Sequence, residues 1–294
     1  MYIFRSPEIK MKKIYYLPIF LLIIFSFSYI YISEARGAEL VDTNSYENRN
    51  LKLTIEHYYD RELVLEYWIT TVKPENQNTL STLIKKSFSN SEPNNLNINE
   101  HENPLEHARR LNSLFAINAS GWNTANGNIN GVQIKEGRVH QNTSNTSGWY
   151  TLGIDDEGIM NVFSGTITGQ ELTTNYNIRN TFSFSIPIII NGEEVNQHIY
   201  EAYAPSYNEL HPRQIIGQVK DTNDIVILTV DGRSEKSRGM TLPEAAEILL
   251  ERNCRIAYNL DGGGSVHTIF QGKLLNNPAD GEIRDTTDLL YIEE

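Results

Sequence analysis

The chain has 294 residues, a formal net charge of −12 and a single cysteine, Cys254. This length allows one large domain or two small ones, with enough chain to bury a hydrophobic core. The acidic balance, 37 acids against 25 bases, argues against nucleic acid as a partner, because binding a phosphate backbone needs a basic surface. One cysteine excludes an internal disulfide and any multi-cysteine zinc or iron–sulfur site.

The N-terminus has the pattern of an export signal. Lys10, Lys12 and Lys13 precede nineteen uncharged residues, 14–32, and a basic start followed by an apolar run is typical of a secretory signal. An uncleaved membrane anchor is the alternative, because about 20 apolar residues cross a bilayer. Residues 1–35 carry four bases and two acids, so the remaining chain has a net charge of −14. Either interpretation predicts a secreted or extracytoplasmic protein of a bacterial cell envelope.

The next part of the chain predicts a linker followed by strands and short helices. Residues 36–48 are polar and are interpreted as the linker. Apolar and polar residues alternate on both sides of a turn at Asp60-Arg61, which is the pattern of half-buried strands. The elements expected here are strands at 51–55 and 63–69, helices at 80–88 and 104–114, and a buried strand at 115–118.

Short strands separated by glycine turns are expected in the middle of the chain. They fall at 132–134, 139, 152–154 and 159–163, followed by a longer strand at 181–190 that Pro187 interrupts. Asn191-Gly192 is a strong signal for a tight hairpin turn.

The C-terminal third predicts a hairpin, a helix and another strand. Two apolar runs, 215–219 and 225–230, are joined by a polar turn. Thr241-Leu-Pro-Glu244 is a capping box that opens a helix to about Arg252, and a strand follows at 255–260. Strand, helix and strand at this spacing indicate a βαβ unit over 225–260. The expected fold class is therefore α+β or mixed α/β, a single domain over 49–294 whose mixed sheet is flanked by helices.

Two aspartates mark a candidate site, because each follows one of these last two strands. Asp231 and Asp261 both stand before a glycine, and parallel strands place their carboxyl ends at one edge, where open sheets bind ligands. The strands would lie about 4.8 Å apart if adjacent and about twice that with one strand between them. Both separations suit the paired carboxylates of glycosidases, so the choice between retention and inversion stays open. For either aspartate alone, capping a turn is the alternative.

Glycines and arginines surround these aspartates in the sequence. Gly262, Gly263, Gly264 and Ser265 would let backbone N–H groups approach an anion, although a plain tight turn is the alternative. Arginines recognise phosphate with a planar fork of donors, or form surface ion pairs; those near the expected sheet edge are Arg213, Arg233, Arg238 and Arg284. His267 is interpreted either as a proton donor or as an ordinary strand residue. No metal-binding spacing is present, so no cofactor is expected, although a divalent cation at the acidic edge is possible.

These residues resemble the phosphodiester glycosidase family. The similar segments are His211-Pro-Arg-Gln-Ile-Ile-Gly217-Gln, Asp231-Gly-Arg233, Gly239-Met-Thr-Leu-Pro-Glu244-Ala-Ala-Glu, Asn259-Leu-Asp-Gly-Gly-Gly-Ser265, and Asn277-Pro-Ala-Asp-Gly281 with Arg284. A weaker likeness extends to about residue 50 and includes Ala116-Ile-Asn118 and Ser185-Ile-Pro187. After Asn118, Ala119-Ser120 replaces the glycine of the family pattern.

The resemblance implies a hydrolase that cleaves a sugar-1-phosphodiester or a glycosyl-phosphate polymer of the cell surface, releasing free sugar and a phosphomonoester. In that interpretation Asp231 and Asp261 are catalytic. The residues implied to bind substrate are Asn118, on a sugar hydroxyl, with Arg213, Arg233, Gly262, Gly263, Gly264, Ser265, His267 and Arg284. The altered loop after Asn118 motivates one alternative, a non-catalytic glycan-binding module of the envelope. A structural envelope protein is the other. The expected partners are a glycan substrate and, only through the N-terminal segment, a membrane.

Overall fold

The computed structural model describes residues 37–294 apart from 90–96, 147–148, 205, 280 and 294. Residues Ala38–Glu294 form one compact unit. This unit is mostly β, since 42% of the chain is strand and 16% is helix. The expected signal or anchor at 14–32 lies outside the described residues. Within the described ranges, no helix is both long enough and apolar enough to cross a membrane.

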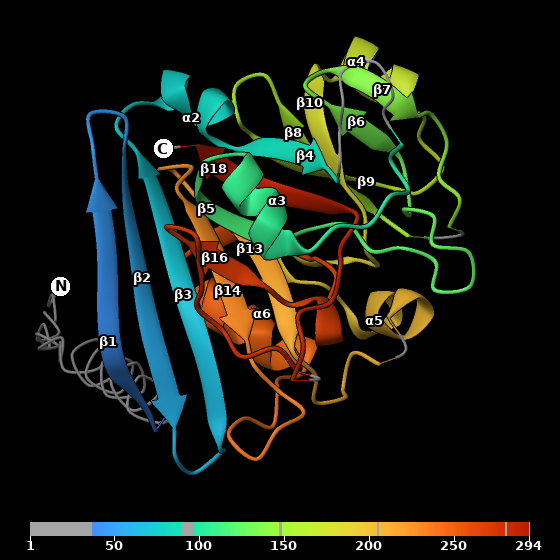
Figure 1. Cartoon of the computed structure of the whole chain (residues 1–294). Helices are drawn as coiled ribbons and strands as arrows, with labels where there is room; N and C mark the ends of the chain where they lie inside the picture. The colour runs from blue at the N-terminus through green and yellow to red at the C-terminus, as the bar shows by residue number, and fades with distance from the viewer. Residues whose placement is uncertain (1–36, 90–96, 147–148, 205, 280, 294) are drawn as a thin grey trace, which may run out of the picture. The chain divides into compact units, whose positions relative to one another are not determined.

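The largest sheet has eight strands, and all its pairings are antiparallel (Figure 1). In spatial order its strands are β1 (Ala38–Glu47), β2 (Leu51–Asp60), β3 (Leu65–Pro74), β14 (Ile225–Val230), β13 (Arg213–Val219), β15 (Cys254–Asn259), β11 (Pro187–Ile190) and β12 (Glu193–Glu194). Three hairpins of this sheet are ones that the sequence predicted: β2–β3, β13–β14, and β11–β12 with its turn at Asn191-Gly192.

A second sheet of five strands lies across this sheet, and two small sheets complete the β structure. The five strands are, in order, β17 (Lys273–Leu274), β16 (Thr268–Phe270), β5 (Ser113–Asn118), β18 (Asp288–Glu293) and β4 (Lys85–Phe88). The small sheets contain β10 (Ile178–Phe182), β8 (Thr151–Asp155) and β9 (Met160–Phe163), and β6 (Gln133–Lys135) with β7 (Arg138–Gln141).

The helices are short. They are α2 (Gln77–Leu83), α3 (Pro104–Arg110), α4 (Gly169–Asn175), α5 (Gln197–Tyr203) and α6 (Leu242–Glu251), with a 3₁₀ turn η1 at Gly263–Ser265. The predicted capping box of α6 is confirmed: the Thr241 hydroxyl accepts a hydrogen bond from the Glu244 N–H at 3.2 Å, and the Glu244 carboxylate accepts one from the Thr241 N–H at 2.8 Å.

The central strands of the eight-stranded sheet are buried on both faces, because α6 covers one face and the five-stranded sheet covers the other (Figure 1). In β14, Ile225 and Ile227 pack in one cluster with Phe115 of β5. The alternate residues, such as Leu228, pack in a second cluster with Ala246 of α6. Five of the six residues of β14 are therefore apolar, which stabilises both layers of the core at about 25 cal/mol per Å² of buried apolar surface.

The predicted fold class is wrong. The protein is mostly β, with several antiparallel sheets, and has no mixed sheet flanked by helices. A continuous apolar strand joined by a helix to another such strand is typical of parallel sheets, because these are covered on both faces. In this protein the five-stranded sheet, rather than a second layer of helices, covers one face of the large sheet. β13 lies between β14 and β15 and pairs antiparallel with each.

Local predictions were also corrected in several places. The predicted linker at 36–48 contains β1, which pairs with β2 over its whole length. Its residues are exposed on both faces, so the sequence lacks the alternation that reveals a strand. The helix expected at 80–88 ends at Leu83 and gives way to β4, and the helix expected at 104–114 ends at Arg110.

Candidate active site

The ends of three neighbouring strands form one edge of the large sheet. β13 begins at Arg213, opposite Val230 at the end of β14, and Asn259 at the end of β15 lies opposite Ile215. Because β14 and β15 each run antiparallel to β13, they point the same way, roughly 10 Å apart across that strand. Asp231 therefore comes to the same edge as the turn after β15.

Glycines allow three backbone segments to cross closely at this edge. A Cβ on Gly232 would lie 2.8 Å from the Gly239 Cα, and one on Gly262 would lie 2.9 Å from the Pro212 oxygen. Gly239 has a φ of +89°, and a Cβ there would lie 2.7 Å from the His211 carbonyl carbon. Real Cβ atoms do not approach so closely, so glycine is required at these positions.

A cavity of about 430 Å³ opens at this crossing, and we call it the arginine cavity. Its lining includes cationic, aromatic and glycine residues: Arg213, Arg233 and Arg284, His211, Trp149 and Phe184, Gly262, Gly263 and Gly264, and also Asn259. His211, Arg213, Arg233, Asn259 and Arg284, with the glycine triplet, lie in segments identified from the sequence. None of the cavity-lining residues carries a carboxylate.

Arg213 is buried and supports the wall of the cavity. Its Nε donates to the Met240 oxygen at 3.0 Å, and its Nη2 donates to the Ser206 and Glu209 oxygens at 3.0 and 2.9 Å. Burial, with the nearby charge of Arg233, lowers the pKa of Arg213 to about 10. The guanidinium is still cationic at neutral pH, and it fastens the 206–209 segment to the strand end.

Arg233 extends over the glycine turn. A Cβ on Gly263 would lie 3.1 Å from both Nη atoms of Arg233, so the missing side chain makes room for this guanidinium. Arg233 Nη2 lies 3.2 Å from His211 Nδ1, and His211 Nε2 lies 2.8 Å from a Glu209 carboxylate oxygen. The chain Glu209–His211–Arg233 orients an otherwise exposed cation toward the cavity.

Asp261 does not line the cavity, but it directly precedes Gly262, Gly263 and Gly264, which do. Burial raises the pKa of Asp261 to about 7, although hydrogen bonds from the Ser265 side chain and the Gly262 N–H, with the charge of Arg284, oppose the rise. Asp288 contributes to the rise as a like charge. A carboxyl group with this pKa exchanges a proton readily near neutral pH.

Asp231 lies against the C-terminal loop and is not among the residues that line the cavity. Its carboxylate accepts hydrogen bonds from the Asn277 N–H at 3.0 Å, the Asn277 side chain at 2.8 Å and the Asn276 side chain at 3.3 Å. Burial raises the pKa of Asp231 to about 6 against these bonds. The sequence predicts Asp231 and Asp261 as a pair in one site. In the structure the Asp231 carboxylate is hydrogen-bonded to Asn276 and Asn277 instead.

Asn118 and His267 join β5 to the turn after β15. The Asn118 side chain donates to the Asp261 carbonyl at 2.7 Å and accepts from the His267 N–H at 3.1 Å. This amide is engaged with the backbone and lies outside the cavity lining. The His267 ring is fully buried, and burial lowers its pKa to about 4, so it is neutral at pH 7.

The backbone of the glycine turn is also engaged internally. The Gly263 N–H donates to the Pro212 oxygen at 3.0 Å, and the Ser265 N–H donates to the Gly262 oxygen at 3.2 Å. The Gly262 N–H bonds to Asp261, so three of the four N–H groups that were expected to bind an anion are already engaged. The glycines instead provide close approach for Arg233.

Eight of the residues that line the cavity were not predicted as site residues, and Trp149, Phe184 and Asn259 are the most informative of them. Trp149 and Phe184 form an edge-to-face pair with ring centroids 5.4 Å apart. Asn259 is 2% exposed, and its Oδ1 has no hydrogen-bond partner in the described part of the chain. The sequence could have predicted Asn259 as a site residue, because it is the first residue of the Asn259–Ser265 motif. Nothing local marks Trp149 and Phe184, which come from loops outside the motifs.

Among the described residues, no three His, Cys, Asp or Glu side chains are grouped so that they could hold a metal ion. That no cofactor is needed stays a prediction.

Comparison with known proteins assigns the chain to a family. A family profile described as phosphodiester glycosidase matches residues 112–293. The chain belongs to the phosphodiester glycosidase family. The profile includes every segment on which the resemblance was based, so that prediction is confirmed.

Relatives of this chain cover different parts of it. Over 268 residues, 88% of this chain and 41% of the relative, it is 31% identical to the SPbeta prophage-derived uncharacterized protein YomE of Bacillus subtilis. Over 73 residues, 25% of this chain and 14% of the relative, it is 40% identical to bovine N-acetylglucosamine-1-phosphodiester alpha-N-acetylglucosaminidase. The chain thus spans less than half the length of either protein.

Solved structures share the fold. The zebrafish N-acetylglucosamine-1-phosphodiester alpha-N-acetylglucosaminidase catalytic domain, described as auto-inhibited by its pro-peptide, superposes with a TM-score of 0.68 and 21% identity, covering 90% of this chain and 92% of that one. A hypothetical protein from Synechocystis superposes with a TM-score of 0.63 and 12% identity, covering 85% of this chain and 63% of that one.

Proposed function

We propose that this phosphodiester glycosidase is an exported hydrolase that cleaves the glycosidic bond of a sugar-1-phosphodiester. The observation that carries the proposal is the arginine cavity. Arg213, Arg233 and Arg284 line it in a chain whose net charge is negative, and Asp261, with a pKa raised to about 7, directly precedes the glycines of the lining. The substrates proposed are N-acetylglucosamine phosphodiesters or glycosyl-phosphate polymers of a cell surface.

The phosphate would bind to the arginine side chains. Arg233 and Arg284 line the cavity, and guanidinium groups form paired, charge-assisted hydrogen bonds with phosphate oxygens. Arg213 donates three hydrogen bonds to backbone oxygens, so it stabilises the cavity wall and adds positive charge there. The sugar would lie toward Trp149 and Phe184, whose rings give an apolar face for packing against it.

Asp261 would act as the general base. In the proposed step it takes a proton from a water molecule, the water oxygen bonds to the anomeric carbon, and the bond from that carbon to the phosphate oxygen breaks. The bonding electrons leave with the phosphate, giving free sugar and a phosphomonoester. Phosphate is a good leaving group, so a strong general acid matters little. Asp231 would be a positioning residue, which holds Asn276 and Asn277 against the sheet edge.

Hydrolysis of a panel of sugar-1-phosphodiesters, followed by release of free sugar, tests this function. We expect Asp261→Asn to lower kcat by about 10²–10⁴-fold, because an amide cannot accept the proton. The control is Asp156→Asn, which changes an exposed aspartate in a turn and leaves turnover unchanged. Equal turnover by the Asp261 and Asp156 variants would contradict the assignment of the base.

A non-catalytic glycan-binding module is the second candidate. It is favoured by one observation, the lack of a carboxylate among the residues that line the cavity. In that case the same panel would show saturable binding that Arg233→Ala weakens, with no sugar released. Export is proposed from residues 14–32 alone, and detection of the protein outside the cytoplasm of its host would test it.

A further inference from the structure

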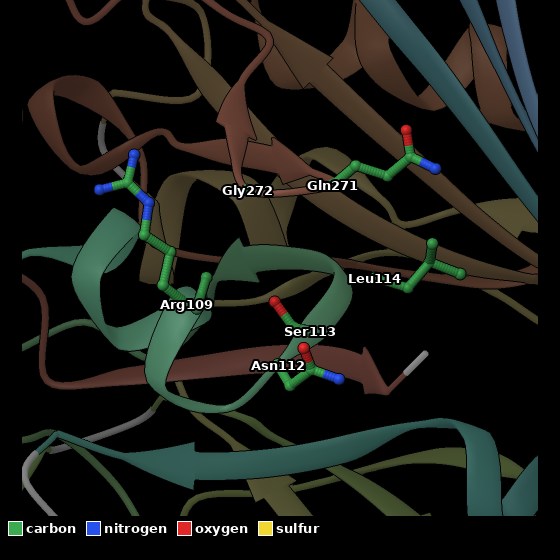
Figure 2. Close-up of a pocket in the computed structure, with 7 residues that line it drawn as sticks. Arg109, Asn112, Ser113, Leu114, Gln271 and Gly272 are labelled. Atoms are coloured by element: carbon green, nitrogen blue, oxygen red, sulfur yellow. The ribbon is translucent and has the colours of Figure 1, made fainter.

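A second cavity of about 340 Å³ lies at the other end of the five-stranded sheet, and we call it the β5–β16 cavity. It is formed where α3 ends and β5 begins, beside the turn that joins β16 to β17 (Figure 2). β5 runs from this cavity to the Asn118 end beside Asp261. Five residue steps of about 3.4 Å separate these ends by roughly 17 Å. The two cavities share no lining residue.

The polar side chains around the β5–β16 cavity make no side-chain hydrogen bond or ion pair to the described part of the chain. Arg109, Asn112, Ser113 and Gln271 line it. Figure 2 shows Arg109 on one side and Gln271 on the other, with Ser113 between them. The Ser113 residue is 9% exposed, and its buried Oγ has no hydrogen-bond partner among the described residues. The neighbouring Arg110 differs, since its Nη2 pairs with a Glu102 carboxylate oxygen at 2.6 Å.

The turn at the rim of the β5–β16 cavity has a backbone conformation that does not favour glutamine at position 271. Gln271 and Gly272 have φ values of +48° and +72° and form the tight turn between β16 and β17. Turns of this kind favour Asn, Asp or Gly at the first position. Gln271 is therefore a poor turn former that places a long carboxamide at the rim of the cavity. At Gly272, an added Cβ would meet no atom within 4 Å, so this side of the cavity is open.

The chemistry of the lining indicates the ligand. A guanidinium binds an oxyanion, and two carboxamides and a hydroxyl donate to and accept from hydroxyl groups. No carboxylate lines the cavity to repel a negative charge. Its volume is near the lower end of the range of about 300–1,000 Å³ for small-molecule sites, which suits a single small polar unit. We propose that the β5–β16 cavity is a second carbohydrate site, in which Arg109 binds the acidic group of an anionic sugar and the carboxamides of Asn112 and Gln271 bind its hydroxyls.

Calorimetric titration of the full-length protein with glucose 1-phosphate tests this site. We expect two binding events in the unaltered protein. Arg109→Ala should weaken one of them at least tenfold, whereas Arg110→Ala, beside it on the same helix but paired with Glu102, should leave both unchanged. Arg233→Ala should weaken the other event only. A single event that Arg109→Ala does not affect would overturn the second site, whatever happens at the arginine cavity.

Two further comparisons separate sugar binding from simple anion binding and from loss of fold. Glucose and inorganic phosphate should each bind the second site at least tenfold more weakly than glucose 1-phosphate; equal affinity of either probe would overturn the assignment to an anionic sugar. Gln271→Asn should keep or raise the Tm, because Asn suits the turn, and should still weaken this event severalfold because its side chain is shorter. Unchanged affinity in the Gln271→Asn variant would show that the Gln271 side chain does not bind the ligand.

Discussion

At the scale of single residues, Asp261 links the chemistry of the site to the stability of the fold. Its pKa is about 7 in the folded protein, against about 3.8 when exposed. The folded state therefore holds the proton more tightly than the unfolded state. Below about pH 3.8 both states are protonated and burial costs no charge. As the pH rises toward 7, the unfolded state ionises first, and the free energy of unfolding falls.

Replacing Asp261 by Asn is therefore expected to stabilise the protein at neutral pH while it removes activity. At pH 8 we expect the free energy of unfolding to rise by roughly 1–3 kcal/mol, after allowing for partial exposure of the group. The gain should shrink to a small fraction of this value at pH 4, where the folded carboxyl is protonated and the unfolded one is only partly ionised. Urea unfolding at the two pH values measures this. A gain that is the same at both would show that ionisation of Asp261 does not cause it.

At the scale of elements, a buried ion pair joins two strands of the five-stranded sheet. Lys86 of β4 and Asp288 of β18 are both fully buried, with Lys86 Nζ 3.2 Å from Asp288 Oδ2. Asp288 also accepts a hydrogen bond from the Ser120 N–H at 2.7 Å, in the loop that follows β5. The aromatic rings of Phe88 and Phe182 each lie 4.9 Å from Nζ. The pair therefore connects the sheet to the Asn118–Ser120 segment behind Asp261.

Removing one partner of this pair should be costly. Lys86→Met leaves the Asp288 carboxylate buried without its cation, so we expect a loss of about 3–5 kcal/mol in the free energy of unfolding. The double variant Lys86→Met with Asp288→Asn removes both charges and should recover part of that loss. Denaturant unfolding of the two variants makes the comparison. A double variant at least as unstable as the single one would argue that packing, rather than the unpaired charge, sets the cost.

Local patterns predicted the elements far better than their arrangement. The β13–β14 hairpin and the capped α6 were predicted because turn residues and the capping box act over a few neighbouring residues. The sheet was mispredicted because burial of β14 on both faces comes from α6 on one side and the distant β5–β18 layer on the other. Similarly, the motifs placed Arg213, Arg233 and Arg284 in the site, whereas Trp149 and Phe184 reach it only through the tertiary fold.

At the scale of the whole molecule, net charge and the arginine cavity act on a substrate in opposite directions. The chain without residues 1–35 carries −14, so a polyanionic polymer is repelled at long range. The cavity offers a small cluster of positive charge, which acts only at contact. Salt screens both effects, but the Debye length falls from about 10 Å at 0.1 M to 3 Å at 1 M, so the long-range repulsion is lost first.

This difference predicts how salt changes substrate preference. Between 0.05 and about 0.5 M salt, kcat/KM for a glycosyl-phosphate polymer should rise severalfold relative to kcat/KM for a small, singly charged sugar-1-phosphodiester. The small substrate is the control, because it feels the same arginines and little of the net charge. Parallel measurements of sugar release at each salt concentration give the ratio. If the ratio fell steeply with salt, the polymer would have to be attracted over an extended basic surface rather than bound at one cavity. Such a surface would conflict with the acidic balance of the chain.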